Sequence, residues 1–581
     1  MNALPLPETW LPLLTAIALL APLLLAFRPA ATGWAALAPL PALLLALGPA
    51  YHVDVGVLLL GARFGVHAGS APFLLLAALL WGTATWFARA YMAHDEHAAR
   101  YHVFHRLAMT GNLGLLLAQD IGSFYFFFAM MSLSSYPLVI HDGRRESRLA
   151  GRIYLALALL GEILQFASFS IIAVSAEAWT FDAVREAVIA SPQRDAILWL
   201  ALLGFGIKAA LVPLHVWLPL AHPVAPTPAS AVLSGSMIKA GLVGWMYVLP
   251  LGAIAAPHIG EPMIVAGLVG VFGAALAGVT QRQPKAVLAY SSISQMGLMI
   301  LATGIGLARP EAMNYVFPAI ALYAVHHALA KGALFLGVGM ATSAPRAAVG
   351  RALLWVGLGV AALALAGLPF TSGAAAKIFL KTAAAEAPGD WPARLALLLS
   401  LGAIGTTLLM ARFLWTLREK IAHAPDADHA ADRGIWLPWL ALLALVVTAP
   451  WWVAAQFAPE KAASAASLKY AVTLSWPIAV GALAALGAIL AIRKRPVEVP
   501  PGDVLAIGAW LFARAMRFYR LQRPTLGARI RAADDARAAA RTGMKNLLRA
   551  LAGTERYLRT LGIAGIALAL LTALLIWRLG G

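Results

Sequence analysis

The sequence predicts an all-α, polytopic membrane protein, and three observations point to this fold class. Of the 581 residues, 61% are hydrophobic and only 12% are charged. The mean hydropathy is +0.79, far above that of a soluble protein of this length. Apolar stretches of about 17 to 25 residues recur along the chain, and each is long enough for a helix to cross ~30 Å of hydrocarbon. We therefore expect about sixteen transmembrane helices by this length criterion.

The expected spans are distributed from one end of the sequence to the other. The first, residues 11–27, should stay in place as a membrane helix, because no basic segment followed by a cleavage-site pattern accompanies it. The full set lies near residues 11–27, 34–50, 72–92, 104–119, 122–140, 153–175, 196–214, 226–249, 263–280, 286–306, 316–341, 352–385, 393–417, 436–455, 471–492 and 561–578.

The formal net charge of +18 follows from membrane topology rather than from nucleic-acid binding. If the N-terminus lies outside, most cations fall in loops on one side: Arg28, Arg100, Arg106, residues 143–152, Arg282, Lys285, Arg346, Arg351, residues 412–420 and 493–495. The opposite loops hold only scattered cations: Arg63, Arg185, Arg194, Arg309, Arg394, Lys461 and Lys469. The positive-inside rule makes the basic side cytoplasmic. We expect a multi-pass protein of the cytoplasmic (inner) membrane with both termini outside.

Two lysines lie inside apolar segments, where a cation is costly. Lys208 belongs to the segment 196–214 and Lys239 to the segment 225–249. An ammonium group at the bilayer centre costs roughly 2.5 to 3.5 kcal/mol even on the lenient insertion scale, so such residues usually face a wet cavity or a partner on an ion path. The alternative is a lysine that snorkels to the headgroups, which is difficult for Lys239, about a dozen residues from either end of its segment.

Prolines interrupt two of the expected spans. Between the two lysine helices the sequence contains Pro213, Pro223 and Pro226, which end or break helices. A second break, at Pro369, precedes Lys377. Non-helical backbone at membrane depth survives only where it is buried in protein or lines water. Paired interrupted helices are typical of inverted-repeat transporters, and we expect two five-helix repeats over about 104–250 and 262–417.

The region around these breaks resembles a known family. Residues 204–244 (GFGIKAALVPLHVWLPLAHPVAPTPASAVLSGSMIKAGLVG) are similar to the signature of the antiporter-like proton-conducting subunits of respiratory complex I, membrane-bound group 4 hydrogenases and Mrp-type cation/proton antiporters. Supporting segments are 131–136, 285–297, 326–335 and 367–377, so the resemblance covers about residues 104–417. The AHP-x-AP form is more similar to the hydrogenase-linked and Mrp branches than to the distal complex I branch.

The resemblance implies a role for several buried side chains. Lys208 would change its protonation state by pairing with a membrane glutamate, and Lys239 would pass protons onward. Lys377 would connect to the outer half-channel. His326, His327 and Lys331 would complete the relay, since an imidazole can donate and accept a proton near neutral pH. The alternative for the histidines is a structural hydrogen bond to the backbone.

One position departs from the family pattern. Where the family has a glutamate on the fifth span, this chain has Ala129, so the usual partner of Lys208 is missing. Glu162 lies about 15 Å along its helix from Arg152, and Ala129 lies about 16 Å from Ile140, so the two positions share a depth on consecutive spans. We hypothesise that the carboxylate has moved one helix over. The alternative is a polar helix contact in a subunit that no longer pumps protons.

The remaining segments complete the expected organisation. Residues 500–560 are basic, with arginines three apart among leucines and aromatics, which predicts an amphipathic lateral helix on the cytoplasmic face. The segment also resembles the lateral helix that some members of this family use to clamp their neighbours. The alternative is a solvated linker to the last span. The expected parts are N-terminal helices (1–103), a proton-conducting core (104–417), accessory helices (418–499), the lateral segment (500–560) and a last helix (561–581).

Other candidate sites are less specific. His94, His97, His102 and His105 fall in i, i+3 pairs that could bind a metal, although a histidine-rich helix junction of this kind is more often solvated. Asp120 could belong to an exit path or cap a helix. The chain contains no cysteine, which excludes thiolate-bound clusters, and it has no phosphate loop, dinucleotide fingerprint or nucleophile elbow. We expect no bound cofactor or metal, and no self-contained catalytic site.

Two classes of function remain open at this point. One is a proton-translocating subunit of a larger membrane complex similar to an NADH-quinone oxidoreductase or hydrogenase, with sodium/proton exchange and proton-driven inorganic-carbon uptake as variants. The other is a structural anchor that kept the fold and lost the pump. The expected partners are other membrane subunits, protons or sodium, and the lipid bilayer, but not nucleic acid.

Overall fold

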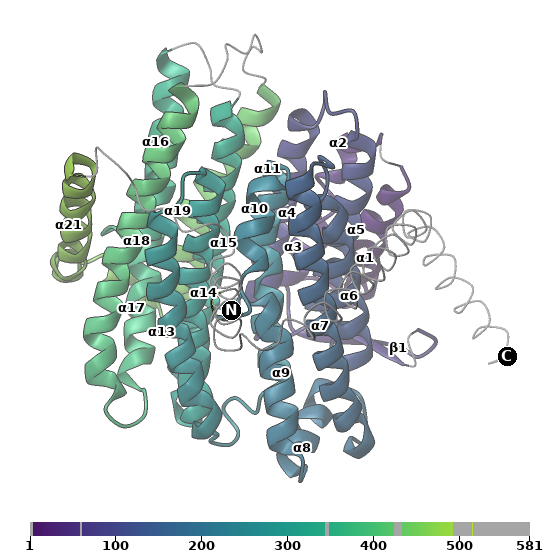
Figure 1. Cartoon of the computed structure of the whole chain (residues 1–581). Coiled ribbons are helices and arrows are strands. Elements are labelled where there is room, and N and C mark those ends of the chain that lie inside the picture. Colours follow the sequence, from purple (N-terminus) through teal and green to yellow (C-terminus); the bar gives the residue numbers. More distant parts are fainter. Residues whose placement is uncertain are drawn as a thin grey trace, which may run out of the picture. The chain divides into compact units, whose positions relative to one another are not determined.

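The computed structural model describes residues 4–28, 30–58, 61–342, 348–422, 433–491 and 514, and most of them are helical (Figure 1). Residues Met1–Asp503 form one compact unit. The predicted lateral segment and the predicted last span near 561–578 lie outside the described residues, apart from Arg514.

Within the described ranges, ten helices are long and apolar enough to cross a membrane. Shorter apolar helices occupy the first two expected spans, so the count of sixteen stays a prediction. The elements other than the two strands are α1 (Trp10–Ala26), α2 (Thr32–Ala35), α3 (Leu40–Leu47), α4 (Ala71–Tyr91), α5 (Ala98–Leu117), α6 (Ile121–Val139), α7 (Arg145–Ser175), α8 (Phe181–Ala190), α9 (Arg194–Lys208), α10 (Trp217–Val224), α11 (Thr227–Val232), η1 (Leu233–Met237), α12 (Lys239–Val248), α13 (Pro257–Val279), α14 (Pro284–Ala308), η2 (Pro310–Ala312), α15 (Met313–Thr342), α16 (Ala348–Ala366), α17 (Ser372–Ala385), α18 (Trp391–Ala422), α19 (Arg433–Phe457), α20 (Pro459–Ala465) and α21 (Leu468–Ala491).

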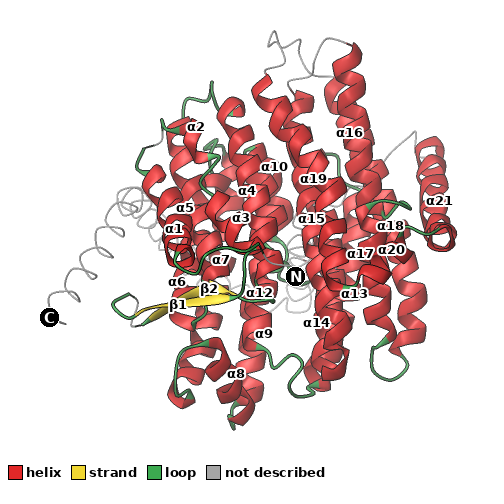
Figure 2. Cartoon of the chain, turned by 180° about the vertical axis from the view of Figure 1, so that it is seen from behind, coloured by secondary structure: helices red, strands yellow, loops and turns green. Residues whose placement is uncertain are grey.

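One element departs from the all-α prediction. Strands β1 (Tyr51–Val55) and β2 (Ala62–Val66) form an antiparallel hairpin, visible in yellow in Figure 2. The amide of Gln119, just after α5, donates to Arg63 O at 2.9 Å. The hairpin therefore attaches to the connection between α5 and α6. Its two strands are only five residues each, too short to give a clear alternating pattern.

The first lysine helix ends earlier than expected. The span predicted over 196–214 stops at Lys208, where α9 ends, and the next residues form turns with Ala210 at a φ of 59°. Pro213 lies in this break and disfavours helix in the residue before it. Pro226 is the residue before α11, which is followed by the π-helix η1 and then by α12, beginning at Lys239. Pro223 does not separate two helices; it is part of the last turn of α10, which ends one residue later.

The second break lies between α16 and α17. The span predicted over 352–385 is two helices, joined by a short turn that contains Pro369. Gly367 has a φ of 87° and Phe370 a φ of 64°, so the chain cannot continue as a right-handed helix here. The backbone break leaves Lys377 in the second turn of α17.

Two helices form the buried centre of the bundle. Every residue of α14 is buried, and so is the whole spanning window of α15. On the other side of α14 lies α13, which approaches closely through glycines: a Cβ atom placed on Gly267 would meet Gly297 O at 2.5 Å. Small residues at such crossings let helix backbones approach closely in membranes. Polar groups on α14 and α15 are thus enclosed by protein on all sides.

Candidate functional site

Glycines set the position of the first lysine. Helices α7 and α9 cross where Gly161 faces Gly204, and a Cβ atom on either residue would lie 3.0 Å from the carbonyl oxygen of the other. Gln165 Nε2 donates to Gly204 O at 3.3 Å beside this crossing. Glu162 follows Gly161 directly, and Lys208 lies one turn beyond Gly204. The close crossing therefore brings an acid and a base into the same interior region.

The ammonium group of Lys208 lies among aromatic side chains. Its Nζ donates to Tyr154 Oη at 3.2 Å, and it lies 5.7 Å from the ring centre of Phe128 and 5.8 Å from that of Trp217. Aromatic faces attract a cation, more strongly when water is excluded. Lys208 is 5% exposed, and a cavity of about 250 Å³, including space open to its surroundings, lies beside it.

Glu162 is the acidic residue whose charge acts on Lys208. Its side chain is 6% exposed, and its Oε1 has no hydrogen-bond partner. No direct ion pair joins Glu162 to Lys208, but their charges lie close enough to interact. Ala129, where the family has its glutamate, is half-buried on α6 and directly follows Phe128, which contacts the lysine. Phe128 and Ser132, on either side of Ala129 along α6, line the cavity beside Lys208.

A second group of polar side chains surrounds Lys239. Its Nζ lies 2.6 Å from His327 Nδ1 and donates to Ser234 O at 2.9 Å. Lys239 is 1% exposed and His327 is fully buried. The Nε2 atom of His327 has no partner. The π-helix η1 supplies the carbonyl of Ser234, and single π-turns of this kind are frequent at functional sites.

The other predicted relay residues lie along α15 and α17. Lys331 Nζ donates to Leu288 O at 2.7 Å, and His326 Nδ1 lies 2.9 Å from Ser372 Oγ at the start of α17. Lys377 Nζ donates to Ala366 O, the last residue of α16. Each of these three predicted residues therefore meets a neighbouring element of the bundle.

The predicted residues fall into two groups. The charges of Lys239, His327 and Lys331 interact with one another, and His326 interacts with both Lys239 and Lys377. Lys208 and Glu162 form the other group, and no hydrogen bond or ion pair between described residues connects it directly to Lys239. The structure thus brings together the members of each group but does not join the groups through side chains alone.

Asp120 makes the hydrogen bonds of a helix cap. Its Oδ1 accepts from the amide of Ser123 at 2.7 Å, at the start of α6, and its Oδ2 accepts from the amide of Arg63 at 2.8 Å. Both carboxylate oxygens are thus occupied by backbone donors. Of the two alternatives for Asp120, the structure provides the geometry of the cap.

The histidine-rich stretch near α5 forms a packed corner. Among the described residues, no group of three or more metal-ligating side chains is positioned to hold an ion. His105 contacts Thr85 and Tyr101, and His141, in the loop after α6, lies 3.1 Å from Asp95 Oδ1. Burial lowers the pKa of His141, and the Asp95 carboxylate opposes this only in part.

The structure also reveals buried polar residues that the sequence reasoning did not select. His222, inside the AHP-x-AP segment, is fully buried against Phe335, and neither ring nitrogen has a hydrogen-bond partner. Lys285, assigned above to a cytoplasmic loop, is buried and donates to Ala225 O at 2.6 Å. Lys381 shares a pocket with Lys377. A search for every polar residue inside the matching segments would have found His222, whereas Lys285 and Lys381 lie at predicted helix ends, where lysines are ordinary.

Comparison with known proteins supports the resemblance noted in the sequence. The family model described as NADH:quinone oxidoreductase/Mrp antiporter, TM, matches residues 118–402. Hydrogenase-4 component F homolog of Methylacidiphilum infernorum is 30% identical over 419 residues, which are 67% of this chain and 85% of that protein. Hydrogenase-4 component B of Escherichia coli is 32% identical over 283 residues, 46% of this chain and 42% of that protein. The chain thus spans less than half the length of component B.

Solved structures agree on the fold. The Mrp complex from Dietzia sp. DQ12-45-1b contains a chain that matches with a TM-score of 0.69 at 20% identity, covering 92% of this chain and 62% of that one. The membrane-bound sulfane sulfur reductase, an archaeal respiratory membrane complex, contains another, with a TM-score of 0.65 at 21% identity and coverage of 90% and 95%. At these identities the likeness concerns the fold. The chain belongs to the NADH:quinone oxidoreductase/Mrp antiporter family of membrane subunits.

Proposed function

We propose that the chain is a proton-translocating subunit of a multi-subunit membrane complex. Protons move through buried lysine, glutamate and histidine side chains rather than through a continuous open pore. The relatives and structural neighbours, which are components of multi-subunit membrane assemblies, support the expectation of partner subunits. The energy source lies in those partners or in an opposing ion gradient.

The contact between Lys239 and His327 carries this proposal. An ammonium group and an imidazole meet at 2.6 Å, and both side chains are enclosed by protein. A proton can pass between them in either direction without a change of backbone, because one nitrogen can donate while the other accepts. A purely structural pair at this depth would place two basic groups together at a desolvation cost with no compensating carboxylate in contact.

On the predicted orientation, the second group of residues is ordered across the membrane. Lys331 lies four residues beyond His327 on α15, about 6 Å nearer to the cytoplasmic side. His326 contacts Ser372 at the break between α16 and α17, and Lys377 follows on α17 toward the outside. This order supports a path from Lys331 through Lys239 and the two histidines to Lys377.

The first group acts as the switch in this proposal. Glu162 replaces the glutamate that the family has at the position of Ala129, and Lys208 changes partner as the carboxylate gains or loses its proton. A charged pair in a low-dielectric region responds strongly to small movements of either group. Motion of α7 relative to α9 at their glycine crossing would therefore alter the protonation of Lys208.

The test is proton flux in vesicles that contain the complete native complex, under redox drive or an imposed gradient. Lys239→Ala and His327→Ala should each assemble normally and lower flux by about tenfold or more, because a positioned proton carrier contributes a factor of about 10² to 10⁴. Lys461→Ala is the control, since this lysine of α20 lies over the ring of Tyr315 and is not a member of the proposed relay. Normal assembly with wild-type flux in both relay variants would contradict the proposal.

Two alternatives to the proposed function are each supported by one observation. Ala129 in place of the family glutamate favours a non-pumping anchor. The similarity to Na(+)/H(+) antiporter subunit A1 of Staphylococcus haemolyticus, 29% identical over 294 residues, favours cation/proton exchange. Flux measured with and without sodium separates exchange from proton transport alone, and proton-driven inorganic-carbon uptake would show as a dependence of flux on bicarbonate.

A further inference from the structure

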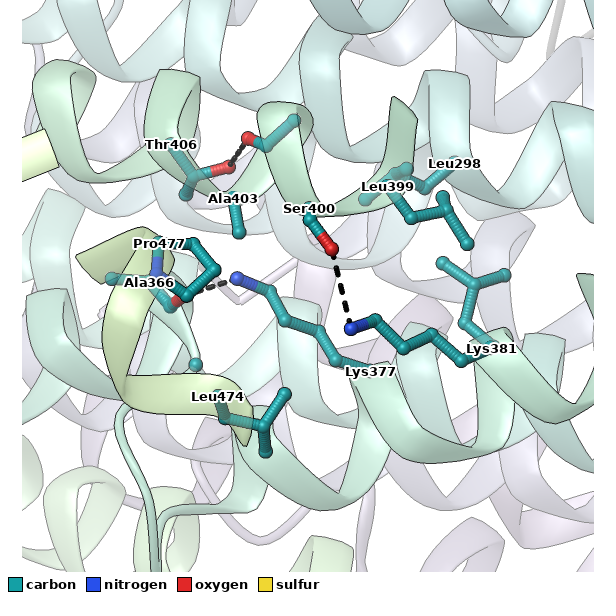
Figure 3. Close-up of a pocket in the computed structure, with 13 residues that line it drawn as sticks. Leu298, Ala366, Lys377, Lys381, Leu399, Ser400, Ala403, Thr406, Leu474 and Pro477 are labelled. Carbon is teal, nitrogen blue, oxygen red and sulfur yellow. Dashed lines mark hydrogen bonds between the residues drawn. The ribbon is translucent and has the colours of Figure 1, made fainter. Parts of the chain in front are cut away.

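A pocket beside Lys377 contains a second lysine that the proposed relay does not use. The pocket encloses about 430 Å³, including space open to its surroundings, and lies between α14, α17, α18 and α21. Figure 3 shows Lys377 and Lys381 extending from α17 toward this space. Lys381 is one helical turn beyond Lys377, so both side chains occupy the same face of α17.

Neither lysine has its hydrogen-bonding capacity satisfied by protein. An ammonium group has three N–H donors. Lys377 donates to Ala366 O, and Lys381 Nζ makes only a long contact of 3.4 Å with Ser400 Oγ. The hydroxyl of Thr406, which also lines the pocket, already donates to Gly402 O and accepts from Gln295 Nε2. The free donors therefore need water in the pocket, which has room for it.

As ammonium groups the two lysines repel each other, and among the described residues no aspartate or glutamate lines this pocket to offset the repulsion. Their charges interact directly. Like charges one turn apart on a helix are unfavourable, more so where water is scarce. A proton that arrives on Lys377 thus favours the loss of a proton from Lys381.

Lys381 lies nearer than Lys377 to the side that the sequence predicts to be external. Helix α17 runs from the break at Gly367 toward Ala385, and Glu386 just beyond it pairs with Arg309 at 3.2 Å. Arg309 belongs to a loop predicted to be outside. Lys381 is about 6 Å further along this direction than Lys377, and it is half-buried where Lys377 is buried.

We propose that this pocket is a proton-release site, in which Lys381 accepts the proton from Lys377 and passes it to water on the outer side. At the start Lys381 is an ammonium and Lys377 a neutral amine. A proton that arrives on Lys377 drives one proton from Lys381 to water on the outer side. The ammonium of Lys377 then gives one proton, through pocket water, to the neutral amine of Lys381, which restores the starting state with one proton released. The proposal rests on the proposed function, since it needs protons delivered to Lys377.

Helix α21 forms one wall of the site. Leu474 and Pro477 line the pocket, and α21 packs tightly on α18 where Gly481 meets Thr407: a Cβ on this glycine would lie 2.7 Å from the threonine Cβ. Other faces of α21 carry exposed apolar side chains, such as Val472 and Leu483, so this helix lies between the pocket and an apolar surface.

Four variants in the complete native complex test the release site: Lys381→Gln, Lys381→His, Lys381→Arg and the control Lys461→Gln. Glutamine cannot carry a proton, so flux should fall by about tenfold or more. Histidine exchanges protons readily and should restore a substantial part of the flux. Arginine keeps the positive charge but does not release its proton, and should be as slow as glutamine. Immunodetection of the assembled complex accompanies every flux measurement.

The outcomes separate this inference from the proposed function. Lys239→Ala is measured in parallel, and low flux in that variant with wild-type flux in Lys381→Gln would overturn the release site alone. Restoration by arginine would also overturn it, because a fixed charge that holds an anion or shapes the local field would then suffice. Wild-type flux in both Lys239→Ala and Lys381→Gln would remove the proposed function and the release site together.

Discussion

At the scale of single residues, the most informative feature is Ala129, which stands where the family has a glutamate, together with Glu162 on the next helix. The charge of Glu162 interacts with Lys208, and Ala129 directly follows Phe128, whose ring lies 5.7 Å from the lysine Nζ. If the carboxylate has moved between helices, the two positions should be interchangeable. Glu162→Gln should assemble and lower proton flux by about tenfold or more, because the proton switch is lost.

The double variant Glu162→Gln/Ala129→Glu tests this interchange directly. It returns the carboxylate to the helix where the family has it, and flux should recover in part. Glu186→Gln on the exposed face of α8 serves as the control for the loss of one negative charge. Wild-type flux in Glu162→Gln would remove this glutamate from the mechanism.

A second residue-scale prediction concerns His141, outside the membrane spans. Burial is the main cause that lowers its pKa below 6.5, so below that pH the unfolded state binds more protons than the folded state. Stability is therefore present above about pH 6.5 and is lost as the pH falls toward the folded pKa. Asp95, His97 and Arg100 face the same imidazole, and Asp95 offsets part of the effect.

His141→Asn should therefore weaken the pH dependence of unfolding. The thermal midpoint of the wild type should fall between about pH 7.5 and about pH 5.5, the range in which histidine titrates. The fall should be smaller in His141→Asn. An exposed histidine variant, His258→Asn, should keep the wild-type dependence. An equal fall of the thermal midpoint in all three proteins would show that His141 does not control the stability of the fold at acidic pH.

At the scale of elements, the close crossing of α7 and α9 keeps Glu162 and Lys208 near each other. Gly204→Leu would place side-chain atoms where the Gly161 carbonyl and the Gln165 amide already lie 3.0 Å from an ideal Cβ. Overpacking of this kind costs about 1 to 3 kcal/mol, and relief requires the helices to separate. We expect a lower thermal midpoint and reduced proton flux.

A glycine without neighbours provides the matched control for this variant. Gly273 is exposed on α13, and a Cβ there would meet nothing within 4 Å. Gly273→Leu should leave both the midpoint and the flux unchanged. If Gly204→Leu behaved in the same way, the close crossing would be unnecessary for Lys208 and Glu162 to act together.

The elements also show what the sequence could and could not predict. Long apolar runs indicated the helices well, since burial in lipid or protein requires a continuous apolar segment, and the breaks near Pro213 and Pro369 followed from proline chemistry. The end of α9 at Lys208 depended on a left-handed residue, Ala210, that has no sequence signature. The short hairpin around Gly61 was hidden because its five-residue strands lie between two apolar helices.

At the scale of the whole molecule, the predicted relay residues lie in two buried groups rather than in one continuous chain of side chains. The family resemblance indicated the identities of Lys208, Lys239 and Lys377, because each lies in a matching segment. Which histidine would meet Lys239 was not predictable, since His326 and His327 are neighbours and only the rotation of α15 selects His327. Coupling between the groups must therefore pass through water or through movement of the helices.

The last prediction concerns the division of the chain near residue 503. Met1–Asp503 forms a compact unit by itself, and the sequence predicts that the remainder clamps a neighbouring subunit. A chain truncated after Asp503 should keep the thermal midpoint of the full chain, because its internal packing is retained. Its recovery with partner subunits of the native complex should fall, as measured by co-purification at matched expression. Equal recovery would show that the association resides within the helices before residue 503, and a lowered midpoint would show that the last residues stabilise the bundle itself.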